Sequence, residues 1–335
     1  MRVLVQIGLL LILALQEGQP PTISVSRKAQ TQVDSRGIAL APPIRCDERN
    51  NIFVRVYPSG AYGPMPITRI SSDGKTVTNL DLSSVPDLPE RSSIRDFVVN
   101  PDGEVFVLVQ GVRANVIVEF RSNGQFVRKT TIEKIGVTKF AVFGNGDFLV
   151  LGIERPTNEK PHASQPFNAL YSSGGKFLKS IRFEDDDKIQ KQAETGDSDV
   201  SPNGPGTGNR AVSLGWATTA ADGNVYAMRF VSPPIIYVVT PAGEVARRFT
   251  VGEGNQIPLG FQVAQGRLLM LLAIKDAQKL SAEAVIANTE TGDVIAKYRV
   301  PEHFGAALAC YDGTQALWLG GNIQGKMGIL AAEMR

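Results

Sequence analysis

The chain has 335 residues, of which 43% are hydrophobic and 20% charged, so it can form an apolar core and is not a disordered chain. Its 35 Lys and Arg residues nearly balance its 33 Asp and Glu residues, giving a formal charge of +2. Because no long basic run is present either, nucleic acid is not expected as a partner. Closed β-rich folds of about 250 residues or more can form one domain, so a single large domain is compatible with this length.

Residues 1–19 have the outline of a signal peptide. Arg2 precedes the apolar run Val3 to Leu15, which Gln6 and Gly8 interrupt, and polar residues follow. The run is shorter than the roughly 20 residues of a helix that spans a bilayer, so a membrane anchor is the weaker interpretation. We expect export to the periplasm or the extracellular space, and residues 20–335 as a mature domain without a membrane span.

A repeated unit follows this segment. The clearest copy runs from Leu214 to Val251 and another from Asp96 to Ile132. Each copy alternates β-branched and aromatic strands with short turns that contain Gly, which reaches positive φ without steric cost. Four strands in about 40 residues are the length of one blade of a β-propeller.

Counting the first turn of each copy predicts six blades. These turns are Asn50-Asn51, Asp102-Gly103, Asn145-Gly146, Asp222-Gly223, Gln265-Gly266 and Asp312-Gly313. The wide interval between the third and fourth turns contains residues 184–210, which are rich in Asp, Gly, Pro and Asn. We predict a flexible loop between blades there and no further blade.

A second turn closes the outer hairpin of the first five copies, at Asp73-Gly74, Asn123-Gly124, Gly174-Gly175, Ala242-Gly243 and Thr291-Gly292. The sixth copy lacks one, so its outer strand is missing. The alternating segment Thr22 to Ser26 could supply this strand and close the ring, which protects edge strands from aggregation. The predicted fold is therefore all-β: a six-bladed propeller of four-stranded antiparallel blades, closed by an N-terminal strand in the last blade.

Two motifs carry a resemblance to known families. Asp222-Gly223-Asn224-Val225-Tyr226 and Thr240-Pro241-Ala242-Gly243-Glu244-Val245 resemble the NHL-type repeat and the six-bladed propellers similar to the C-terminal domain of TolB. The resemblance covers roughly residues 36–335 and concerns the scaffold. Some propellers of this kind are lactonases or lyases with a divalent metal in the central channel, but no motif here matches their metal ligands.

The expected loops differ between the two faces of the ring. In a four-stranded meander, the first and third connections lie on one face, and the second and the inter-blade connections on the other. The predicted long connections all belong to the second set: Pro58 to Pro66, Ser83 to Ser93, Glu154 to Pro166, Glu184 to Arg210 and Ile274 to Ala284. Because binding residues concentrate on loops held by rigid scaffolds, we expect the site on this face, around the mouth of the channel.

The candidate ligand-binding residues in or beside these connections are Tyr62, Arg113, Arg155, His162, Arg229 and Lys275. Arg can bind a carboxylate or phosphate through two parallel hydrogen bonds. The predicted function is binding of a protein, peptide or glycan by a monomer. A lactonase-like, metal-assisted hydrolase or lyase with a channel site is the alternative, and a structural component of the cell envelope is a third option.

Few residues are available for metal or acid–base chemistry of the common kinds. The chain has two histidines, His162 and His303, and two cysteines, too few for a zinc cluster built from neighbouring residues. No Gly-x-Ser-x-Gly motif marks a nucleophile. We therefore name no catalytic residue, no metal ligand and no cofactor, although a divalent cation is an option.

The two cysteines suggest a disulfide. Cys46 and Cys310 are expected late in the innermost strands of the first and last blades, which are neighbours in a closed ring. A bond between them requires Cα atoms within about 7 Å. In an exported protein such a pair can be oxidised. Two free thiols are the other outcome.

Overall fold

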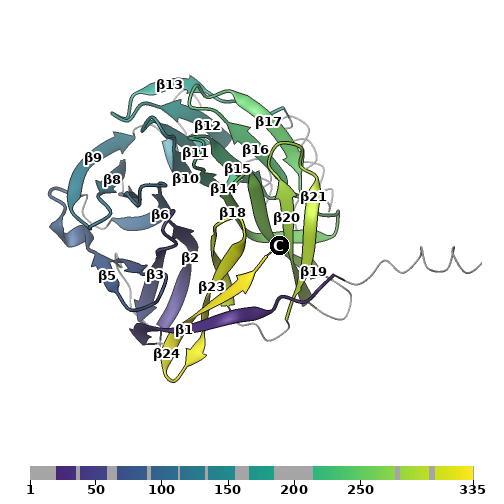
Figure 1. Ribbon diagram of the computed structural model, residues 1–335. Coiled ribbons are helices and arrows are strands. Elements are labelled where there is room, and N and C mark those ends of the chain that lie inside the picture. The colour runs from purple at the N-terminus through teal and green to yellow at the C-terminus, as the bar shows by residue number, and fades with distance from the viewer. Residues whose placement is uncertain are drawn as a thin grey trace, which may run out of the picture.

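In a computed structural model, six four-stranded antiparallel sheets stand around a central axis (Figure 1). The structure describes residues 20–34, 38–58, 66–88, 92–111, 114–132, 135–154, 166–184, 214–275, 280–301 and 306–334. The predicted signal peptide, residues 1–19, and most of the predicted loop 184–210 lie outside these ranges. The predicted six-bladed propeller is confirmed.

Each of the first five blades is a meander of consecutive strands. Blade 1 contains β2 (Ile38–Cys46), β3 (Ile52–Pro58), β4 (Ile67–Ile70) and β5 (Val77–Leu80). Blade 2 contains β6 (Ser93–Val99), β7 (Val105–Gln110), β8 (Asn115–Phe120) and β9 (Phe126–Ile132). Blade 3 contains β10 (Ile135–Val142), β11 (Phe148–Glu154), β12 (Pro166–Tyr171) and β13 (Phe177–Ser180). Blade 4 contains β14 (Leu214–Thr219), β15 (Val225–Arg229), β16 (Ile235–Val239) and β17 (Val245–Thr250). Blade 5 contains β18 (Gln256–Ala264), β19 (Arg267–Lys275), β20 (Leu280–Asn288) and β21 (Val294–Val300).

Blade 6 combines both ends of the chain. Its strands β22 (Ala306–Tyr311), β23 (Gln315–Ile323) and β24 (Lys326–Glu333) are completed by β1 (Val25–Asp34), which pairs antiparallel with β24. The missing outer strand is thus supplied from the N-terminal side, as predicted. A short 3₁₀ helix, η1 (Leu82–Ser84), follows blade 1.

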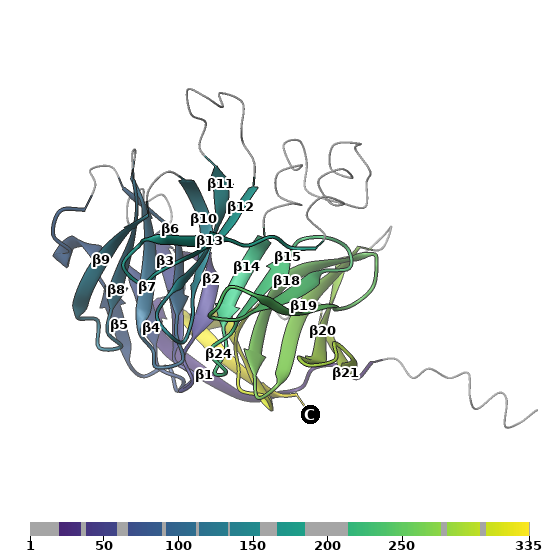
Figure 2. The same ribbon diagram turned by 90° about the horizontal axis from the view of Figure 1, so that it is seen from above.

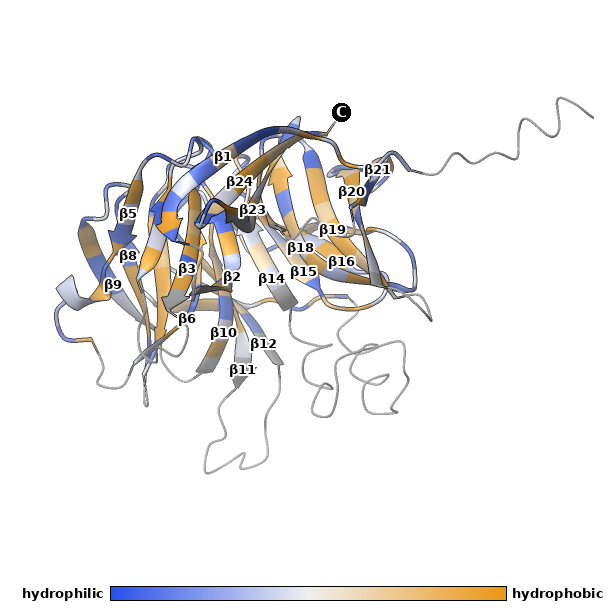
Figure 3. Cartoon of the chain, turned by 90° about the horizontal axis from the view of Figure 1, so that it is seen from below, coloured by the Kyte–Doolittle hydropathy of each residue, from blue (hydrophilic) through white to orange (hydrophobic). Residues whose placement is uncertain are grey.

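The position of the closing strand differs from the expected segment Thr22 to Ser26. Thr22 forms an isolated bridge with Arg299 of blade 5, and pairing with β24 begins at Val25 and continues to Asp34. The strand extends through polar residues because one of its edges faces solvent, and Figure 3 shows it as largely hydrophilic. An alternation of apolar residues alone could not show this extent.

The hydrophobic core consists of layers between neighbouring blades. Strands of blade 1, through Phe53 and Ile67, pack against Phe97 and Val118 of blade 2 in one such layer. Because both faces of each sheet are covered, the central strands β7, β15 and β16 are almost continuously buried and apolar. The sequence therefore has nearly continuous apolar runs at these strands.

Short turns close the first and third connections on one face of the ring. Asn50, Gly103, Gly146, Gly223, Gln265 and Gly313 have positive φ at the first turns. In the turn between β4 and β5 of blade 1, Gly74 has φ of 77°. A Cβ there would lie 2.8 Å from the Gln30 carbonyl oxygen of β1. Glycine thus serves both the turn and the approach of β1 to blade 1.

The strand ends that flank the second connections and the inter-blade connections lie at the opposite face, as the antiparallel strand order requires (Figure 2). Long intervals separate β3 from β4, β11 from β12, and β13 from β14 on this long-connection face. The predicted long connection from Ile274 to Ala284 is wrong in extent: β19 continues to Lys275 and β20 begins at Leu280. The two strands pair along this whole length, so the hairpin is tighter than its mixed composition suggested.

Candidate site in the central channel

A cavity of about 410 Å³ lies between the innermost strands of blades 1, 4, 5 and 6. It is lined by Pro43, Ile44, Arg45, Trp216, Leu259, Gly260, Phe261, Gln262, Leu271, Ala307 and Leu308. Trp216 and Ala307 lie near the starts of β14 and β22, and innermost strands begin at the long-connection face. The cavity therefore extends from the middle of the channel toward that face. Its volume falls in the range of roughly 300–1,000 Å³ found for ligand pockets.

Irregular pairing directs side chains into the channel. The register between the first two strands shifts just before Asp96 in blade 2, Lys139 in blade 3, Trp216 in blade 4 and Gly260 in blade 5. Such bulges bend a strand and re-aim its side chains, and they are frequent next to functional sites. The first two strands of blades 1 and 6 shift in the same way, before Arg45 and Cys310, so the feature recurs in all six blades and three charged residues, Arg45, Asp96 and Lys139, directly follow a shift.

Three cations and one carboxylate gather at blades 1 to 3 beside the cavity. Lys139 Nζ lies 3.4 Å from Asp96 Oδ1, and the Asp96 side chain is fully buried. Arg45 is 6% exposed and donates from Nε to the Phe97 carbonyl oxygen at 3.4 Å. Arg55 is 9% exposed and donates to the Ile94 carbonyl oxygen at 3.0 Å. Asp96 is thus shared by two cations, Lys139 and Arg45, which leaves these three groups with a net charge of +1.

The pKa values of two of these groups reflect first their burial and then their charged neighbours. Burial lowers the pKa of Arg45, and the nearby Asp96 acts in the opposite direction. Burial also lowers the pKa of Lys139; Asp96 raises it, while Arg45 and Arg55 lower it further. Both cations are thus held where solvent does not fully compensate their charge, and a bound anion would favour their protonated forms.

Among the residues expected to bind a ligand, Arg229 is the one whose side chain the structure describes. It is fully buried at the end of β15, with its guanidinium carbon 5.4 Å from the ring centroid of Tyr237 and 5.9 Å from that of Phe183. Lys275 is the last residue of β19 and pairs with Leu280, but its side chain lies outside the description. Tyr62, Arg113, Arg155 and His162 also lie outside the described residues.

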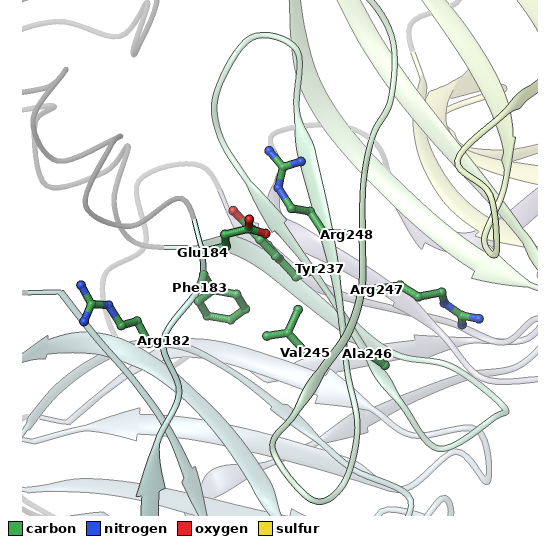
Figure 4. A pocket seen from close by; sticks show the side chains of 8 residues that line it. All are labelled: Arg182, Phe183, Glu184, Tyr237, Val245, Ala246, Arg247 and Arg248. Atoms are coloured by element: carbon green, nitrogen blue, oxygen red, sulfur yellow. The ribbon is translucent and has the colours of Figure 1, made fainter.

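A second cavity, of about 570 Å³, lies between blades 3 and 4, away from the channel strands. Figure 4 shows Phe183 and Tyr237 at its centre, while Arg182 and Arg247 point away from each other on opposite sides. Arg247 reaches Glu290 of blade 5 at 3.9 Å. These arginines do not converge on one point, so the channel is the better candidate for a site.

The predicted site residues do not include these channel residues, although their place in the repeat is a sequence signal for them. Asp96, Lys139 and Trp216 each stand six residues before the first turn of their blade, at Asp102, Asn145 and Asp222. In blades 1 and 5, the residues six positions before Asn50 and Gln265 are Ile44 and Leu259, which line the cavity, whereas the residues that directly follow the register shift are Arg45 and Gly260. Aligning the copies of blades 2, 3 and 4 on their first turns identifies Asp96, Lys139 and Trp216 as equivalent positions.

The described residues offer no set of three or more His, Cys, Asp and Glu side chains that could hold a metal ion. Nor does any helix in these ranges have the length and apolar character needed to cross a bilayer. The cations around Asp96 disfavour a divalent cation beside it, because like charges would be brought together in a poorly solvated place. The donor set of the channel is suited to an anion.

No family model matches the sequence, and no curated protein matches it. Similar solved structures include a protein of unknown function from Bacteroides caccae, with 13% identity, 79% of this chain and 83% of that chain covered, and a TM-score of 0.47. Hydrazine synthase of Kuenenia stuttgartiensis has 12% identity, coverages of 87% and 79%, and a TM-score of 0.45. TolB of Acinetobacter baumannii has 11% identity, coverages of 89% and 63%, and a TM-score of 0.45. The propeller fold itself rests on the strand order described above.

Proposed function

We propose that this protein is an exported binding module that recognises a protein, peptide or glycan ligand on the long-connection face of the propeller. The observation that carries the proposal is the coincidence of the longest connections with the face toward which the channel cavity extends. Variable loops around a recess in a rigid ring are a common arrangement for recognition. The channel side chains supply hydrogen-bond donors and apolar surface, which are binding groups.

Site-specific photo-crosslinking on the two faces tests this proposal. Asn255, in the connection between blades 4 and 5, is an exposed position on the long-connection face. Asn123, in the third turn of blade 2, is an exposed position on the opposite face and provides a matched control. A photoreactive residue at each position is exposed to the secreted and envelope fractions of the source cells.

We expect one reproducible crosslinked partner from position 255 and none from position 123. Equal labelling from the two positions, or none from either, would contradict recognition on the long-connection face. Export has a separate readout: the protein recovered from source cells should begin near residue 20, because a signal peptide is removed. A cytosolic protein that still begins at Met1 would refute this part.

A further inference from the structure

We propose that the channel cavity binds the carboxylate of a ligand with an apolar body, with the carboxylate beside Arg45 and Lys139 and the apolar part against Trp216, Phe261 and Leu308. This inference rests on the proposed binding function, since it names the chemical group that the long-connection face would admit into the ring. The cavity has a polar half and an apolar half.

The polar half begins with Arg45, which lines the cavity and is 6% exposed. Within the described part of the chain, its Nη2 atom has no hydrogen-bond partner. A guanidinium has five N–H donors, and leaving a buried charged donor unsatisfied costs more free energy than leaving a neutral one. An acceptor atom entering the cavity would satisfy this donor.

The charges of the side chains around Arg45 determine which charge its missing hydrogen-bond acceptor should carry. Asp96 is paired with Lys139 and is also the carboxylate that acts on Arg45, so two cations share one carboxylate. A single anionic group would compensate the positive charge that remains. It would interact strongly, because solvent screens a buried pair less than an exposed pair.

The apolar half follows from the other wall of the cavity. Trp216 packs edge-on against Phe230 with ring centroids 5.1 Å apart, which holds the indole in place. Leu259, in the bulge of β18, is 47% exposed although it lines the cavity. Phe261, Leu271 and Leu308 continue this wall. Covering Leu259 would remove apolar surface from water, which favours binding.

The two halves together favour a carboxylate over other anions. A planar carboxylate can accept two parallel hydrogen bonds from a guanidinium. A phosphate dianion would place a second negative charge near the Asp96 carboxylate, whose Oδ2 atom is also buried without a partner among the described residues. A small inorganic anion would leave the apolar wall exposed, so an apolar body attached to one carboxylate fits best.

Calorimetric titration of the full-length protein with octanoate tests the inference, with octanol, octylamine and inorganic phosphate as controls. We expect octanoate to bind and the three controls to bind at least tenfold more weakly. Arg45→Met should weaken octanoate binding about 10- to 100-fold, the loss typical of a charged hydrogen bond. The matched variant Arg128→Met removes an arginine of β9 whose side chain is 44% exposed, and it should bind as the parent does.

The comparison of ligands on the parent protein remains decisive if Arg45→Met does not fold. Octanol binding as tightly as octanoate, phosphate binding as tightly as octanoate, or no octanoate binding would each overturn the inference. A tripeptide acetyl-Leu-Leu-Phe, with a free or an amidated C-terminus, distinguishes the source of the carboxylate. Tighter binding of the free peptide than of the amidated peptide assigns the site to the C-terminal ends of chains. If octanoate binds and neither peptide does, the site is assigned to small carboxylic acids.

The two proposals fail in different experiments. If octanoate does not bind but position 255 still crosslinks a partner, the carboxylate site is refuted while recognition on the long-connection face stands. If octanoate binds and no partner is crosslinked from either face, the channel site stands and the macromolecular ligand is refuted.

Discussion

Asp96 is surrounded by positive charge in the interior of the ring. Its side chain is fully buried on β6, Lys139 of the next blade lies 3.4 Å away, and Arg45 of the preceding blade contributes a second nearby charge. A buried carboxylate is stable when its partners offset the loss of solvation. Here the carboxylate has the further effect of stabilising cations that come from two different blades.

Replacing Asp96 by Asn should therefore destabilise the protein strongly. Asp96→Asn keeps the shape of the side chain but leaves Arg45 and Lys139 without their carboxylate. Breaking a buried ion pair by removing one partner costs about 3–5 kcal/mol. The measurement is the free energy of unfolding from urea titration at pH 7.

Glu119→Gln is the matched control for this prediction. It breaks the Glu119–Arg128 pair, in which Arg128 is 44% exposed, so a loss below about 1 kcal/mol is expected. If both variants lost the same small amount of stability, Asp96 would not be the anchor of a buried charge cluster.

Residue-level features were predictable to different degrees. The turn positions followed from Asn, Asp and Gly, because a left-handed backbone conformation restricts residue type strongly. Asp222 and Asp312, for example, accept backbone N–H groups at 2.9–3.0 Å within their turns. The channel charges were not predicted, because a charged residue in a strand has the same local sequence signal whether it faces solvent or another blade.

At the scale of elements, the N-terminal segment is a clamp over three blades. Ile23 donates its N–H to the Arg299 carbonyl oxygen of blade 5 at 2.9 Å, and β1 then pairs with β24 of blade 6. Farther along, Arg27 donates to the Ser72 carbonyl oxygen of blade 1 at 3.4 Å. Figure 1 shows β1 running from the region of β21 past β24 toward β5. The N-terminal segment, from Thr22 through β1, therefore joins blade 6 to both of its neighbours.

The anchor of this clamp is the Ile23 side chain. It is 5% exposed and packs in a cluster with Leu269, Ile286 and Trp318 of blades 5 and 6. Ile23→Ala should lower the free energy of unfolding by about 2–5 kcal/mol, because the truncation removes apolar contacts and leaves a cavity. Urea or thermal unfolding measures the change.

Val127→Ala serves as the control for Ile23→Ala. Val127 lies on the outer strand β9 and is 39% exposed, so its truncation should change stability by no more than about 0.5 kcal/mol. Similar small losses for the two variants would show that the N-terminal segment does not clamp the ring.

The sequence predicted that an N-terminal strand completes the last blade, but not which residues form it. Apolar alternation pointed to Thr22–Ser26, whereas Ile23 proved to be a packing anchor and Val25–Asp34 the strand. An edge strand has weak sequence requirements on its solvent side, so its register depends on the partner strand and not on local pattern.

For the whole molecule, closure of the ring is the central problem, because blade 6 is assembled from the two ends of the chain. The two ends of the chain meet at blade 6, and we call this junction the seam. Hydrogen bonds between β1 and β24 close its outer edge. At its inner edge, the structure joins Cys46 of β2 and Cys310 of β22 by a disulfide, with Cα atoms 5.5 Å apart. A backbone pairing and a covalent bond thus close the seam at different radii.

Removing the disulfide should loosen the ring without abolishing the fold. The bond joins residues separated by 264 positions, so it restricts the unfolded chain over most of its length. Disulfides typically add about 2–4 kcal/mol of stability, with larger effects for longer loops in the chain-entropy model. The double variant Cys46→Ser, Cys310→Ser should therefore unfold at lower urea concentration than the oxidised parent, and reduction should bring the parent to the level of the variant.

Mass measurement of the native protein with and without reductant gives an independent check, since oxidation removes two hydrogen atoms. Two free thiols in the native protein, or equal stability of parent and variant, would show that β1–β24 pairing and blade packing close the ring by themselves.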